Sequence, residues 1–140
     1  MNEVLTPISY GELIDKITIL EIKSERISNT EKLANIRHEL RRLNEVWEGH
    51  NDIKTDISLQ WQQLSEINSK LWDLENDIRK CEKNADFGDN FIELARAVYL
   101  TNDERHRIKH EISQLLCSAI VEEKLYTDYS RPKATCSGEN

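Results

Sequence analysis

One long heptad pattern limits the folds available to this chain more than any other feature. Mostly apolar residues recur at alternating spacings of four and three from Ile53 to Cys81, and Gln60 is the one amide among them. This period keeps one side of a helix against a neighbouring helix, as in a coiled coil. The seam positions are Ile53, Ile57, Gln60, Leu64, Ile67, Leu71, Leu74, Ile78 and Cys81. The pattern predicts one long helix over residues 53–81.

Three further helices are predicted around this one. Ser9 and Glu12 have the spacing of a capping box, which starts a helix that ends near Ile27. A second seam over residues 33–47 stops at Gly49, and a fourth helix of about 28 residues begins at Asp86 or Asp89. A short final helix is predicted over residues 119–126.

The expected fold class is all-α, an antiparallel helical bundle built on a long hairpin of coiled-coil-like third and fourth helices. We expect one domain over residues 1–129 and a C-terminal tail over residues 130–140. Because the hairpin helices are longer than the first two, their ends should project with apolar seam uncovered, and a homodimer would bury it. Trp61 and Trp72 flank the seam and are the predicted interaction surface.

Charge and cysteine content exclude several classes of function. The net charge is −7 and no third of the chain is basic, which argues against nucleic-acid and anionic-membrane partners. Three cysteines without a C-x-x-C pair are typical of reduced thiols. Cys81 and Cys117 lie on apolar helical positions and are expected to be buried and inert. With no cationic start or long apolar run at the N-terminus, a soluble cytoplasmic protein is expected.

The predicted fourth helix has a polar waist. Its apolar side is interrupted between Tyr99 and Ile108, where Asn102, Arg105 and His106 stand in place of apolar residues. A buried arginine needs a carboxylate, and Asp15, Glu21 and Glu12 of the first helix are the candidates. The waist is either a polar network that fixes helix register or a notch for an anionic or sugar-like ligand. In the second case Tyr99, Asn102, Arg105 and His106 are the ligand-binding residues.

Three enzyme-like patterns are incomplete. His106 and His110 share a helical face as metal ligands do, but Arg105, Arg107 and Lys109 surround them with positive charge. The E-x-x-E of Glu45 to Glu48 lacks the E-x-x-D that follows it in helical pyrophosphohydrolases. Residues 13–17 resemble the first helix of helical chorismate mutases but lack its early arginine. We therefore predict no catalytic residue, metal or cofactor.

Several stretches match a known pattern at polar as well as apolar positions. They are SYGELIDKITILEIK (9–23), KLANIRHEL (32–40), LARAVYLTNDERHRIK (94–109) and VEEKLY (121–126). In these the chain resembles an uncharacterised family of small bacterial all-helical proteins, a domain of unknown function, over most of residues 6–129. The resemblance implies a helical fold and a bacterial or phage-like origin, and it implies no mechanism.

Two functions remain open on these grounds. The first is a non-enzymatic protein–protein interaction or assembly protein, supported by the long seam and its flanking tryptophans. The second is a small-molecule binding protein or enzyme whose site is the polar waist. Exposed tryptophans would favour the first, and a concave pocket with an unpaired Arg105 would favour the second.

Overall fold

Four α-helices form the regular secondary structure of residues 2–131, the part of the chain that the computed structural model describes. No strand occurs in this part, so the all-α prediction is confirmed for it. The helices are α1 (Tyr10–Arg26), α2 (Thr30–Glu48), α3 (Ser58–Lys83) and α4 (Asp89–Leu115).

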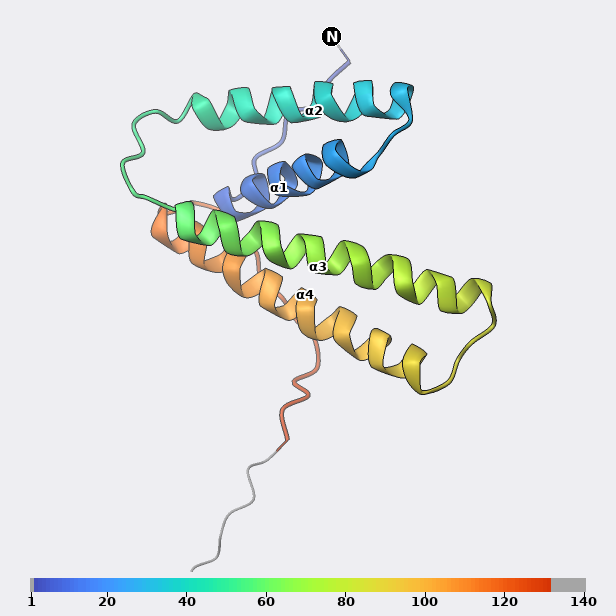
Figure 1. Cartoon of the computed structure of the whole chain (residues 1–140). Helices are drawn as coiled ribbons and strands as arrows, with labels where there is room; N and C mark the ends of the chain where they lie inside the picture. The colour runs from blue at the N-terminus through green and yellow to red at the C-terminus, as the bar shows by residue number, and fades with distance from the viewer. Residues whose placement is uncertain (1, 132–140) are drawn as a thin grey trace, which may run out of the picture.

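The helices pack in layers rather than around a single axis (Figure 1). α3 and α4 form the predicted antiparallel hairpin, and α1 lies against both of them. α2 lies on the outer side of α1 and contains no buried residue. The core is thus made mainly by α1, α3 and α4, and its buried members are Leu13, Ile14, Ile17, Ile57, Leu64, Ile108 and Ile112.

Close contact between α1 and α4 begins at the first turn of α1. The Ser9 hydroxyl accepts a hydrogen bond from the Glu12 amide at 3.2 Å, which confirms the predicted start. The Gly11 amide donates to the Ser113 hydroxyl of α4 at 2.9 Å. A Cβ added at Gly11 would lie 2.1 Å from the Lys109 carbonyl oxygen. Only glycine allows the two backbones to approach this closely.

The third helix begins later than the heptad pattern predicts. It starts at Ser58, so the predicted start at Ile53 is wrong. The Asp56 carboxylate accepts hydrogen bonds from both the amide and the hydroxyl of Ser58, which closes a turn just before the helix. Ile57 is nevertheless buried, so this part of the seam reaches the core from a loop.

The segment after α4 differs from the prediction in two ways. No helix forms over residues 119–126. Cys117 has a φ of 53°, which ends α4, and its side chain is exposed rather than buried. Cys81 is buried as predicted. Cys136 and most of the predicted 130–140 tail lie outside the described residues.

The far end of the α3–α4 hairpin projects beyond α1 and α2 (Figure 1). Phe87 in its loop and Ile92 on α4 are 54% and 52% exposed. Trp61 and Trp72, by contrast, are half-buried within the chain: Trp61 contacts Trp47 of α2, and Trp72 contacts Arg26 of α1. Among the described residues, no helix is both long and apolar enough to cross a membrane.

Candidate functional site

Asp15 of α1 is the centre of the polar waist. Its side chain is 1% exposed, and it receives a two-pronged ion pair from Arg105 of α4. The Arg105 Nε donates to Asp15 Oδ1 at 2.9 Å, and a terminal guanidinium nitrogen donates to Oδ2. The hydrogen bonds to Asp15 raise the pKa of Arg105 further. This paired geometry is the strongest that arginine makes with a carboxylate, and it leaves the guanidinium neutralised.

A side chain of α3 completes this contact. The Asn68 amide nitrogen donates to Asp15 Oδ1 at 2.9 Å and to the Thr18 hydroxyl at 3.0 Å. The Thr18 hydroxyl in turn donates to the Asp15 carbonyl at 2.8 Å. One carboxylate of α1 therefore joins α3 and α4, and it fixes the register of all three helices.

Lys109 is a second buried cation on the same side of α4. Its ammonium donates to Glu12 at 2.6 Å, lies 3.0 Å from Glu122 and lies 3.9 Å from Asp15. Burial lowers the pKa of Lys109, but the hydrogen bonds that its ammonium donates to Glu12 and Glu122 outweigh burial, so the pKa lies above its usual value. Like Arg105, this lysine is neutralised within the chain. Among residues 2–131, every buried side-chain nitrogen or oxygen has a hydrogen-bond partner.

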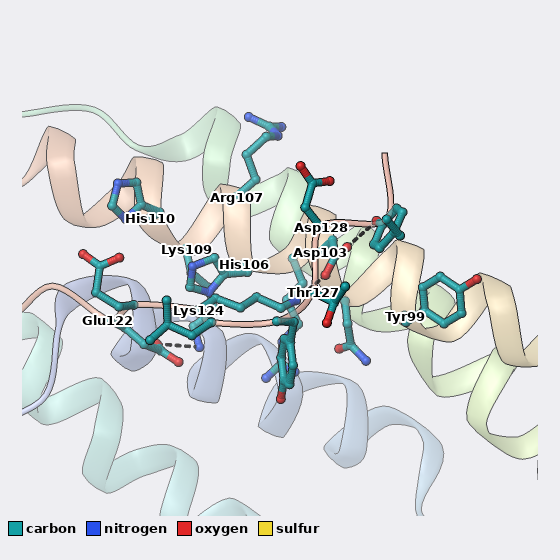
Figure 2. A pocket seen from close by; sticks show the side chains of 16 residues that line it. Tyr99, Asp103, His106, Arg107, Lys109, His110, Glu122, Lys124, Thr127 and Asp128 are labelled. Atoms are coloured by element: carbon teal, nitrogen blue, oxygen red, sulfur yellow. Dashed lines mark hydrogen bonds and ion pairs between the residues drawn. The ribbon is translucent and has the colours of Figure 1, made fainter. Parts of the chain in front are cut away.

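An open groove of about 1510 Å³ lies beside this network (Figure 2). One wall is the exposed side of α4, and the other is the extended segment of residues 122–129, which we call the strap. The α4 wall includes Tyr99, Asn102, Arg105, His106 and His110. The rings of the two histidines stack with their centroids 6.3 Å apart.

The strap is held along α4 by charged and aromatic contacts. Lys124 and the Tyr129 hydroxyl both bond to the Asp103 carboxylate, and they hold the pKa of Asp103 below its usual range. The Tyr129 ring also contacts Tyr99, with centroids 5.6 Å apart. Together with the bond from Lys109 to Glu122, these contacts place polar and aromatic groups on both sides of the groove. The ion pair of Lys124 with Asp103 is partly exposed, and a pair of this kind contributes little stability by itself.

All four residues predicted from the waist lie in the lining of this one groove, namely Tyr99, Asn102, Arg105 and His106. Arg105 does not enter it as a free cation, because Asp15 binds its guanidinium. Asp15 is the partner among the three carboxylates considered, and Glu12 binds Lys109 instead. Sequence reasoning missed the inward positions of Asn68 and Lys109.

His106, in the lining of the groove, is a group whose titration should affect stability near neutral pH. Burial lowers the pKa of His106. The positive charges of Lys124 and Lys109 and the neighbouring His110 lower this pKa further, and the negative charge of Glu122 partly offsets them. The unfolded chain therefore takes up this proton near pH 6.5 and the folded chain takes it up at a lower pH, so stability falls as the pH drops through this range.

Replacing His106 by glutamine should flatten the pH dependence of unfolding between about pH 7 and pH 5. Denaturant unfolding at a series of pH values measures this change. His38→Gln, on the exposed side of α2, is the matched control and should leave the slope in place. An unchanged slope in His106→Gln would contradict the assignment.

Comparison with known proteins identifies the family but no activity. A model of a family of unknown function, DUF6165, matches residues 4–139. No curated protein and no solved structure matched the chain. The match covers nearly the whole sequence, including every helix and the strap, and this chain therefore belongs to the family of unknown function DUF6165.

Proposed function

We propose that the chain is a non-enzymatic assembly protein that forms a homodimer through the far end of its α3–α4 hairpin. The observation that carries the proposal is the apolar surface left there. Phe87 and Ile92 are exposed there, and the Phe87 ring contacts the half-buried ring of Phe91, with centroids 5.4 Å apart. Leu74 and Ile78 of α3 are also only half-buried. Neither α1 nor α2 reaches this end to cover it (Figure 1).

The charges at this end favour a second copy of the same chain as the partner. The last turns of α3 carry Arg79, Lys80 and Lys83 together with Glu82, whereas the loop and the first turns of α4 carry Asp86, Asp89 and Glu93. Arg79 and Lys80 pair with Glu75 and Asp77 of their own helix, but these pairs are exposed and can be exchanged for pairs with a partner at little cost. In a two-fold dimer the same patch of both subunits forms the interface, and the two copies of the patch are related by a half-turn. The cations of one hairpin would then face the carboxylates of the other around the apolar centre.

The waist supports a structural role over catalysis. Arg105 and Lys109 are the more deeply placed cations beside the groove, and both are bound by carboxylates of the chain. The other arginine and lysine of the lining, Arg107 and Lys124, are likewise paired with carboxylates of α4. A catalytic clamp keeps its charge available for the reacting group. The network is therefore suited to hold α1 across the hairpin, which leaves the far end free for assembly.

A charge introduced at the proposed interface tests this function. Ile92→Glu places a carboxylate in the apolar centre, where burial without a partner should weaken the dimer by at least about thirtyfold. Light scattering after size exclusion should give twice the chain mass of 16.4 kDa for the unmodified protein and a monomer for the variant.

The matched control is Leu59→Glu. Leu59 is 61% exposed on the first turn of α3, away from the hairpin end, so this variant should stay dimeric. An unmodified protein that is monomeric at every concentration would overturn the proposal. So would a dimer that Ile92→Glu leaves intact.

A second candidate function is binding of an uncharged polar ligand in the α4 groove. Its support is that Tyr99, Asn102 and His106 line one open groove without a buried free charge. Native mass spectrometry would detect a retained ligand as extra mass. Loss of that mass in Asn102→Ala would support this function, and a bare protein would count against it.

A further inference from the structure

A second pocket lies at the other end of the core, where the loop after α2 enters α3. Its volume is about 440 Å³, and its walls include Trp47 of α2, Trp61 of α3 and Asp56 of the loop. The two indole rings are tilted at 59° with centroids 5.9 Å apart. The structure thus places two aromatic rings and one carboxylate around a single small opening.

The two indole rings of the pocket are held by packing within the chain. Trp47 and Trp61 both pack against the buried core cluster. The Tyr10 ring meets Trp47 edge-on, with centroids 6.5 Å apart. Rings that are held in place by packing keep their shape without a ligand, so a ligand would not have to order them.

The carboxylate is held at the rim. Both hydrogen bonds that Asp56 receives from Ser58 within the described residues use its Oδ1 atom. These bonds lower the pKa of Asp56, so the side chain is ionised at neutral pH. Oδ2 of this exposed carboxylate is available to a ligand at the pocket.

The same helix already shows how an indole of this protein binds a cation. Eleven residues after Trp61, the guanidinium of Arg26 lies over the Trp72 ring at 5.9 Å from its centroid. Among residues 2–131, the described cation–π contacts involve Trp72 and Tyr126, and neither Trp47 nor Trp61 has one.

We infer that the Trp47–Trp61–Asp56 pocket, which we call the indole pocket, binds an organic cation of the alkylammonium class. Aromatic faces attract such cations through the ring quadrupole, and quaternary ammonium groups are recognised in this way. The carboxylate at the rim supplies the opposite charge, and the net charge of −7 favours approach of a cation. The cation comes either from a free quaternary amine or from a lysine side chain of a partner.

The tryptophan signals themselves report on the site. The chain has three tryptophans, so a proton–nitrogen correlation NMR spectrum has three indole N–H signals. Titration with choline should shift the signals of Trp47 and Trp61 in a saturable manner and leave Trp72 in place. The neutral isostere of choline, with carbon in place of nitrogen, should bind about tenfold more weakly.

Two variants separate the charge from the shape of the pocket. Asp56→Asn keeps an acceptor for Ser58 and removes the charge. Choline should therefore bind this variant more weakly, while the NMR signals of residues away from the pocket stay in place and show that the fold is intact. Asp52→Asn makes the same change in the same loop on an exposed residue outside the pocket lining, and it should bind choline normally.

A second probe, acetyl-lysine amide, identifies the source of the cation. Tighter binding of choline assigns the pocket to a free quaternary amine, and tighter binding of the lysine probe assigns it to a partner side chain. Either result supports the inference. No saturable shift with either cation would overturn it, as would equal binding of choline and its neutral isostere.

Discussion

Asp15→Ala should lower the free energy of unfolding by about 3–5 kcal/mol, the usual cost of removing one partner from a buried ion pair. The loss is large because the substitution removes an acceptor from two side chains and a counter-charge from a third. Arg105 loses both of its bonds to Asp15, Asn68 loses one, and Lys109 loses a nearby counter-charge. Burial of Asp15 at 1% exposure prevents water from replacing the carboxylate fully.

Urea unfolding followed by circular dichroism measures this loss, and two controls define its origin. Asp73→Ala removes the ion pair between Asp73 and Arg26, in which the Asp73 side chain is 68% exposed. This variant should lower the free energy of unfolding by no more than about 1 kcal/mol. A double-mutant cycle of Asp15→Ala with Arg105→Ala should show strong coupling between the two positions. A loss below about 1 kcal/mol in Asp15→Ala would show that the network does not hold the helices together.

Gly11→Ala should destabilise the protein by about 3 kcal/mol, at the upper end of the usual cost of overpacking. The added methyl would lie 2.1 Å from the Lys109 carbonyl oxygen and 2.8 Å from the Ser113 hydroxyl oxygen. The first of these is backbone within α4, so it cannot rotate away as a long side chain would. α1 must therefore move off α4, which also weakens the bond from Lys109 to Glu12.

Gly49→Ala is the matched control for this glycine. Gly49 ends α2 with a helical φ of −64°, and its added Cβ would come no closer than 3.3 Å to another residue. Its stability should change by less than about 1 kcal/mol. Equal thermal unfolding of the Gly11→Ala variant and the unmodified protein would contradict the close approach of α1 and α4.

The helices could be predicted because their signals are local. The seam from Ile57 to Cys81 places α3 and its inward side, and Ser9 places the start of α1. The late start of α3 was not predictable in this way. Ile53 has the spacing of a heptad position, but an apolar residue at that spacing can also lie in the loop before the helix. The turn that Asp56 makes with Ser58 decided between them.

The waist could be predicted only in part. The break in the apolar side of α4 pointed to Arg105, and the need for a counter-charge pointed to α1. Asn68 gave no such signal, since one amide beside a seam is usually exposed. Its burial follows from α1 lying across α3, which no local pattern records. The inward position of Lys109 was not predictable for a similar reason. Its partners Glu12 and Glu122 are distant in the sequence, and only the packing of α1 and the strap against α4 brings them to it.

The predicted helix over residues 119–126, which overlaps the start of the strap, is wrong although its apolar residues have helix-like spacing. Ile120, Val121 and Leu125 would form part of one helical side, yet they are 39%, 52% and 93% exposed. Contacts with α4 set the conformation of the strap instead: Glu122 meets Lys109 and Lys124 meets Asp103. Alternate residues bonding to one helix require an extended chain.

Native mass spectrometry of the untagged full-length protein tests the proposed assembly most directly. A single spectrum reports both the number of subunits and any bound molecule. The proposal predicts a dimer of twice 16.4 kDa with no added mass, which separates into monomers in Ile92→Glu. A monomer that carries extra mass would contradict it and would move the function to the groove beside Arg105.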